Sequence, residues 1–93
     1  MTDRIDIGCG HSFAFVEYKG DEHAAIDEYH LTKDGKECKG FIPLKGGSWV
    51  NEFGKDLGAW DVISLDPLTL SPSLLCRVCG SHGFIRDGKW VEA

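Results

Sequence analysis

Two cysteines near the carboxyl end carry the clearest chemical signal in this 93-residue chain. Cys76 and Cys79 are separated by two residues, and Gly80 follows them directly. Two thiolates at this spacing can bind one metal ion when the chain between them makes a tight turn. A thioredoxin-like redox pair would instead open a helix after a strand, whereas this segment leads into a glycine-rich turn and a hairpin pattern. The spacing therefore predicts a structural zinc knuckle.

Tetrahedral zinc needs two further ligands, and two residues are the first candidates. His82 lies three residues after Cys79, so the same turn can bring its imidazole to the metal. Cys38 follows an Asp-Gly turn signal at the head of an expected strand, from which its thiol can approach the knuckle. We therefore expect the ligands Cys38, Cys76, Cys79 and His82 around one Zn²⁺.

Other residues remain open as replacements for Cys38 or His82. The segment Cys9-Gly10-His11 can form a second knuckle, which would complete the site without Cys38. His30 alternates with apolar residues, a pattern more typical of a surface or cross-strand partner than of a ligand.

The elements that must position these side chains read as short strands. Twelve glycines and three prolines interrupt the chain so often that few windows are long enough for a helix. Asp-Gly pairs at 34–35 and 87–88 are typical of hairpin turns, and the glycine-rich stretch 46–58 reads as a loop. Apolar, β-branched or alternating patterns predict strands at 13–18, 25–31, 41–44, 60–66, 84–86 and 89–91, with an edge or bend at 68–71. The expected fold is a single all-β domain over residues 1–93, a small antiparallel sheet or sandwich with the zinc knuckle near its C-terminus.

Charge and composition exclude several classes of function. The net charge is −5, and residues 1–37 hold all of the excess acidic side chains. No basic stripe suited to phosphate is visible, so we expect no nucleic-acid partner. No apolar stretch is long enough for a bilayer, and the first residues lack a secretory pattern. We therefore expect a cytoplasmic protein with reduced thiols and no membrane contact.

Catalysis is the weaker hypothesis from these residues. An enzyme would need an open metal position and a nearby general base such as Asp61, Asp66 or Asp87. The sequence contains no zinc-protease, nucleophile-elbow or phosphate-loop motif. We expect a non-enzymatic protein-interaction module, and a metal-dependent hydrolase with an open zinc site is the alternative.

The last third of the chain resembles a family of short uncharacterised proteins that are common in actinobacterial phages. The resemblance covers residues 60–64, 66–75 and 79–90, which contain a Trp-led strand, a Leu-Ser-Pro-Ser element, and a Cys-x-x-His followed by an Ile-Arg-x-Gly hairpin. Residues 38–44 look like the middle Cys-x-Gly-hydrophobic element of that family. The resemblance implies a small β domain whose zinc ligands include Cys79 and His82, and it favours Cys38. It also implies a phage accessory protein in a bacterial host cytoplasm that binds and disables a host protein.

Overall fold

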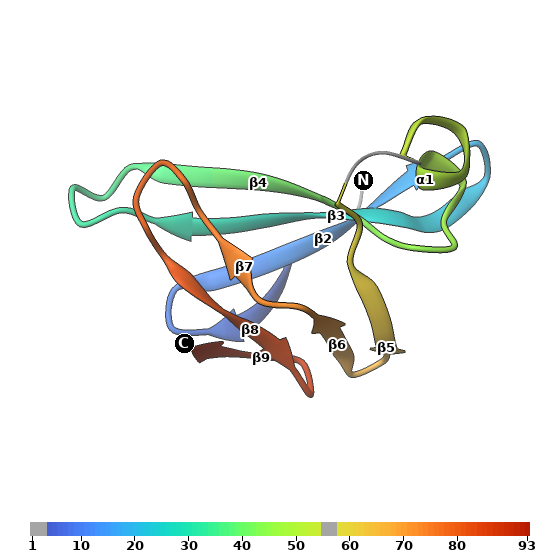
Figure 1. The fold of residues 1–93 in the computed structure, drawn as a ribbon. Coiled ribbons are helices and arrows are strands. Elements are labelled where there is room, and N and C mark those ends of the chain that lie inside the picture. The colour runs from blue at the N-terminus through green and yellow to red at the C-terminus, as the bar shows by residue number, and fades with distance from the viewer. Residues whose placement is uncertain (1–3, 55–57) are drawn as a thin grey trace.

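The computed structural model describes residues 4–54 and 58–93, which form nine strands and one short helix (Figure 1). The first half contains β1 (Ile5–Gly8), β2 (His11–Tyr18), β3 (Asp21–Leu31), β4 (Glu37–Pro43) and α1 (Ser48–Phe53). The second half contains β5 (Asp61–Leu65), β6 (Leu68–Ser71), β7 (Leu74–Leu75), β8 (His82–Arg86) and β9 (Lys89–Glu92).

The first four strands form one antiparallel meander in the order β1-β2-β3-β4. Side chains in its long hairpins point alternately to the two faces of the sheet, so that Ala24, Ile26, Glu28 and His30 are all buried on one face of β3. The tight turns fall where the sequence tolerates positive φ angles. Cys9 and Gly10 have φ angles of 56° and 78° between β1 and β2, as a two-residue hairpin turn requires.

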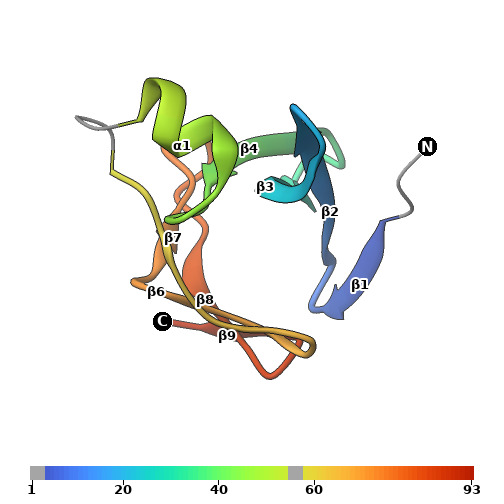
Figure 2. The ribbon, with the colours of Figure 1, turned by 90° about the vertical axis from the view of Figure 1, so that its right-hand side faces the viewer.

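Two smaller antiparallel sheets, β5-β6 and β7-β8-β9, face the meander. Viewed along the strands of the meander, the three sheets surround a common interior (Figure 2). Local backbone contacts connect the sheets. Leu44 after β4 forms a parallel bridge with Trp60 before β5, which joins the meander to the β5-β6 sheet. The Gly88 N–H in the β8–β9 turn donates to the Leu68 carbonyl of β6. The edges of β4 and β7 are not paired to each other by any described strand contact.

The core fills the space between these sheets. Ile26, Leu44, Leu68 and Ile85 are its largest fully buried side chains, and they come from all three sheets. Each belongs to a different strand or strand end, so the interior joins elements that are far apart in the sequence.

The prediction of an all-β domain built from antiparallel sheets is confirmed. The Asp87-Gly88 hairpin has the two positive φ angles expected of it, 51° and 72°. In the expected loop at 46–58, of which residues 55–57 lie outside the described ranges, the structure instead has α1, which begins after Gly47, ends at Phe53 and has no buried residue. Its six residues show no buried stripe, which is why periodicity does not reveal them. No helix in the described ranges has the length and apolar character that a bilayer span requires.

Candidate metal centre

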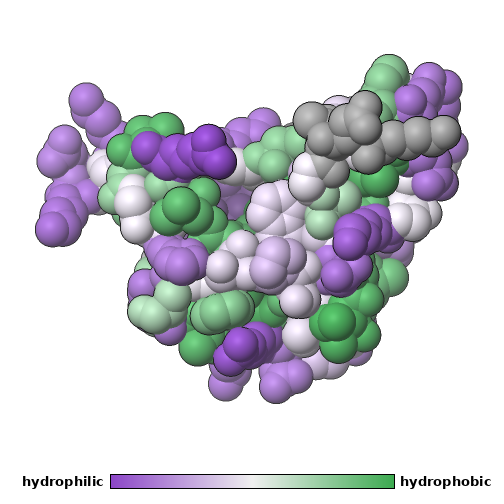
Figure 3. Space-filling model, in the orientation of Figure 1, coloured by the Kyte–Doolittle hydropathy of each residue, from purple (hydrophilic) through white to green (hydrophobic). Residues whose placement is uncertain are grey.

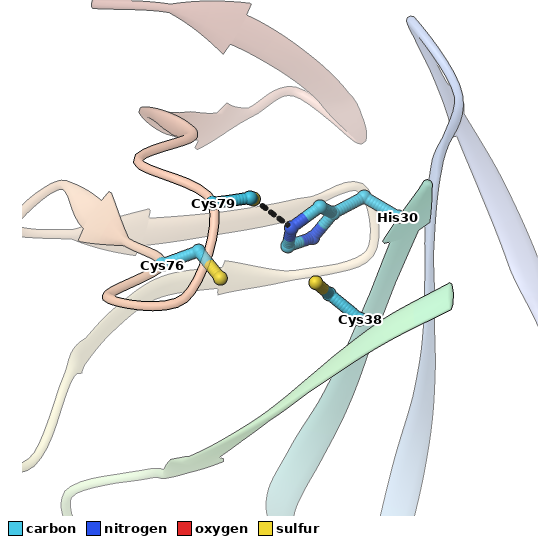
Figure 4. A group of neighbouring side chains, drawn as sticks. All are labelled: His30, Cys38, Cys76 and Cys79. Atoms are coloured by element: carbon cyan, nitrogen blue, oxygen red, sulfur yellow. Dashed lines mark hydrogen bonds between the residues drawn. The ribbon is translucent and has the colours of Figure 1, made fainter. Parts of the chain in front are cut away.

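Four side chains that suit metal binding meet where β3 and β4 pass the loop after β7 (Figure 4). They are His30, Cys38, Cys76 and Cys79, and one ligand atom from each lies within 4.8 Å of the ligand atoms of the others. All four point toward a common centre in the close-up view. One metal ion can therefore contact all four residues.

Strand pairing supplies half of this group. His30 and Cys38 are directly opposite partners in the β3–β4 ladder, so their side chains lie on the same face of the sheet. That face is the inner one, because the period-two pattern also buries Ile26 on β3 and Ile42 on β4. His30 is 5% exposed and Cys38 is 9% exposed.

A tight turn supplies the other half. The Gly80 N–H donates to the Cys76 carbonyl, and the Cys76 N–H donates to the Ser81 carbonyl. Gly80 has a φ angle of 78°, which residues with a side chain rarely adopt, so the glycine after Cys79 lets the turn close. The turn brings both thiols to the same side, as expected for a metal knuckle, while Cys79 remains exposed.

The protonation chemistry of the group also suits a cation. Burial raises the pKa of the Cys76 thiol, but the backbone N–H groups of Cys79 and Val78 outweigh it and lower this pKa to about 7. Burial and the neighbouring thiols raise the pKa of Cys38 to about 11. For His30, burial lowers the pKa, whereas hydrogen bonds to Cys79 and Glu28 raise it to about 9. Three sulfur atoms and the Glu28 carboxylate surround the His30 imidazole. This environment stabilises a positive charge among them.

The imidazole of His30 is held from both sides. Its Nε2 atom lies 3.1 Å from the Cys79 Sγ atom. Its Nδ1 atom lies 2.8 Å and 3.1 Å from the two carboxylate oxygens of Glu28. Glu28 in turn lies 2.9 Å from the Nδ1 atom of His11, whose ring stacks on Trp90 at a centroid distance of 3.8 Å.

Comparison with protein-family models, with curated protein sequences and with solved structures finds no match to this chain. The geometry of the four side chains therefore carries the functional conclusion.

The structure brings together three of the four residues expected from the sequence, Cys38, Cys76 and Cys79, and places His30 where His82 was expected. His82 opens β8, where the alternation turns Gly83 and Ile85 inward and His82 outward. Its Nε2 atom lies 2.8 Å from the Ser73 Oγ atom at the surface. His82 is close to Cys79 in the sequence, but the alternation along β8 points its side chain away from the other three predicted ligands.

The second knuckle considered for Cys9-Gly10-His11 does not reach the group either. Cys9 is exposed in the β1–β2 turn, and His11 faces the carboxylate of Glu28 rather than the sulfur atoms. The signal that could have found His30 was the alternation within β3, which buries Ala24, Ile26 and Glu28 on the same face. A histidine and a glutamate that both fall on a buried face need partners there.

Proposed function

We propose that this chain is a zinc-stabilised protein-interaction module, in which one structural Zn²⁺ fixes the knuckle loop to the main sheet. The observation that carries the proposal is the set of four protein donors, three thiols and one imidazole, within 4.8 Å. Three thiolates with one histidine is a ligand set typical of structural zinc.

Donor chemistry and spacing both favour zinc. Thiolate ligands select zinc or iron–sulfur chemistry over hard cations such as Mg²⁺ or Ca²⁺, and an imidazole beside three thiolates is a common zinc combination. With bond lengths of about 2.3 Å to sulfur and 2.0 Å to nitrogen, tetrahedral geometry places ligand atoms about 3.5–3.8 Å apart. No two of the four donors are more than 4.8 Å apart, which exceeds that spacing by about an ångström at most.

The same donor set argues against the hydrolase alternative. Four protein ligands complete a tetrahedral shell and leave no position at which the ion can activate water. The three carboxylates considered as general bases, Asp61, Asp66 and Asp87, line neither of the two hollows beside the knuckle. A structural role for the metal accounts for the ligands without requiring a base.

The surface around the knuckle supports the interaction role. Val78 at its tip is 85% exposed, and Leu31, Leu75 and Phe41 nearby are 61%, 58% and 44% exposed. These side chains border two hollows on either side of the loop. Apolar residues (green) lie among charged ones on this face of the molecule (Figure 3). Exposed apolar groups gathered at one place mark a contact site more often than isolated ones do.

Two basic residues suggest the chemistry of the partner. Lys39 and Arg77 border the same hollow as Leu75 and Val78, although the whole chain carries a net charge of −5. We propose that the loop binds an apolar segment of a partner protein that carries an acidic residue. The resemblance to phage proteins adds the proposal that this partner is a bacterial host protein and that the module is a phage accessory protein.

The metal half of the proposal is tested on the purified protein. Native mass spectrometry should show one zinc per chain, lost on treatment with a chelator together with most of the thermal stability. A metal-free protein that is fully folded and unaffected by EDTA would contradict it.

The partner half is tested with surface variants. We expect Val78→Ser to lose a host protein that the unaltered chain captures, while the zinc content stays at one per chain. Ile63→Ser is the matched control, because Ile63 is 67% exposed on β5, away from both hollows. Equal capture by both variants would show that the knuckle is not the contact surface.

A further inference from the structure

A buried carboxylate lies directly behind the metal group. Glu28 is 5% exposed and lies between His30 and His11, which are 5% and 4% exposed. The carboxylate is within 2.8–3.1 Å of the Nδ1 atom of each imidazole. Burying a carboxylate costs free energy of folding unless charged or polar groups compensate for it. A glutamate at this buried position therefore indicates a role for its carboxylate.

The hydrogen-bond directions follow from the acceptor. A carboxylate can only accept, so both imidazoles donate their Nδ1–H groups to it. In His30 this leaves Nε2 as the nitrogen that can offer its lone pair to a metal ion beside the three sulfur atoms, once binding displaces the proton from it. Nε2 is the atom that lies 3.1 Å from the Cys79 Sγ atom. The contact with Glu28 thus selects the tautomer that a metal ligand requires.

We propose that Glu28 is a positioning residue of the metal centre and that His11 holds Glu28 in place. The inference rests on the proposed zinc site and deepens it. Carboxylates that accept the second N–H of a metal-bound histidine fix its ring orientation and increase its basicity. Glu28 performs this role for His30 through both of its oxygen atoms, which lie 2.8 Å and 3.1 Å from Nδ1.

His11 extends the arrangement to the third sheet. Its ring stacks on Trp90 of β9 with an interplanar angle of 10°, and the Trp90 indole N–H donates to Glu92 at 2.9 Å. A continuous row of contacts therefore connects the metal centre with β2 and β9. It runs from His30 on β3 through Glu28 to His11 and Trp90. His11 holds Glu28 through its hydrogen bond, which explains why a histidine, rather than an apolar residue, is buried beneath β9.

The test compares Glu28→Gln with Glu52→Gln, the same change at an exposed carboxylate of α1 that contacts Lys19 and Tyr18. Glutamine keeps the size of the side chain and one acceptor, so the fold is retained in excess zinc. We expect Glu28→Gln to weaken zinc binding about 10- to 100-fold in competition with a chromophoric chelator. Glu52→Gln should leave the affinity unchanged.

A spectroscopic measurement separates positioning from a purely structural role. Long-range ¹H–¹⁵N spectra of the zinc-loaded protein should show His30 with its proton on Nδ1. In Glu28→Gln the Nδ1–H signal should move or broaden, while a Co²⁺-substituted sample should keep the absorption of three thiolates. An unchanged His30 signal together with unchanged affinity would overturn the inference.

The two proposals fail in different ways. If the unaltered protein binds no zinc, the proposed function is wrong. If it binds one zinc and Glu28→Gln binds it equally well, only the positioning role is wrong. If the unaltered protein binds two zinc ions and His11→Asn binds one, the His11, Glu28 and His30 donors hold a metal of their own, and the positioning role is likewise overturned.

Discussion

Replacing Cys38 by alanine separates a metal ligand from a buried thiol. Structural zinc sites contribute about 10–16 kcal/mol of apparent binding free energy, which is roughly 2.5–4 kcal/mol for each of four ligands. A domain of this length is stable by about 5–14 kcal/mol from the average per residue. Losing one ligand should therefore remove a large part of the free energy of unfolding, about 2.5–4 kcal/mol in the presence of zinc.

Chemical denaturation with and without a chelator measures this difference. Once the metal is removed, Cys38→Ala should differ from the unaltered protein by only about 1 kcal/mol, the cost of a sulfur-sized space near a buried side chain. The zinc-dependent part is thus about 1.5–3 kcal/mol. Cys9→Ala is the matched control: Cys9 is exposed in a turn, so its loss should change the stability by less than about 0.5 kcal/mol.

Two results would refute this reasoning. If Cys38→Ala costs the same free energy with and without the chelator, Cys38 is a packing residue and not a ligand. If Cys9→Ala is as damaging as Cys38→Ala in zinc, the ligand assignment of the two cysteines is wrong. Mass spectrometry of each variant checks that the measured protein carries the expected metal.

Three further predictions follow from the same geometry. His82→Ala should keep one zinc per chain and a melting temperature close to that of the unaltered protein, and loss of the metal would restore His82 as a ligand. Gly83→Ala should cost about 1–3 kcal/mol in thermal unfolding, because an added Cβ atom would lie 2.5 Å from Trp90; an unchanged melting curve would contradict this packing. Zinc affinity should rise with pH, because binding displaces protons from groups whose pKa values are about 9 (His30) and about 11 (Cys38). At least two displaced protons correspond to an increase of at least about 100-fold per pH unit near neutrality, and a flat chelator-competition profile from pH 6 to 8 would refute it.

Much of the fold could be predicted because its signals are local. Alternation predicts the strand at β5, and Asp-Gly predicts the β8–β9 turn, where both φ angles are positive. β1 and β7 were not predicted, because they are short and, unlike β8 and β9, are not joined by an Asp-Gly turn that marks them as strands. How the three sheets surround one interior depends on contacts such as Leu44 with Trp60, which no local pattern encodes.

The metal centre shows where local spacing stops being informative. The pair Cys76 and Cys79 could be found because one turn determines the distance between the two thiols. His30 could not be found in this way, because it lies 49 residues from Cys79 in the sequence. Its position depends on the register between β3 and β4, which sets His30 opposite Cys38. Sequence proximity favoured His82, and the inward and outward alternation of β8 decided against it.

The placement of the four donors indicates that the proposed metal would link two sheets of the fold. The meander and the β7-β8-β9 sheet share a core but are not joined by strand pairing between β4 and β7 in the described chain. Donors on β3 and β4 face donors on the loop after β7, so one bound ion would cross-link the two sheets at this open edge. A cross-link between distant segments stabilises the fold by restricting the unfolded chain, and the benefit grows with the length of the closed loop. A chain this short gains only a modest stability from burying apolar surface. A metal link between the two edges would therefore contribute noticeably to the stability of the fold.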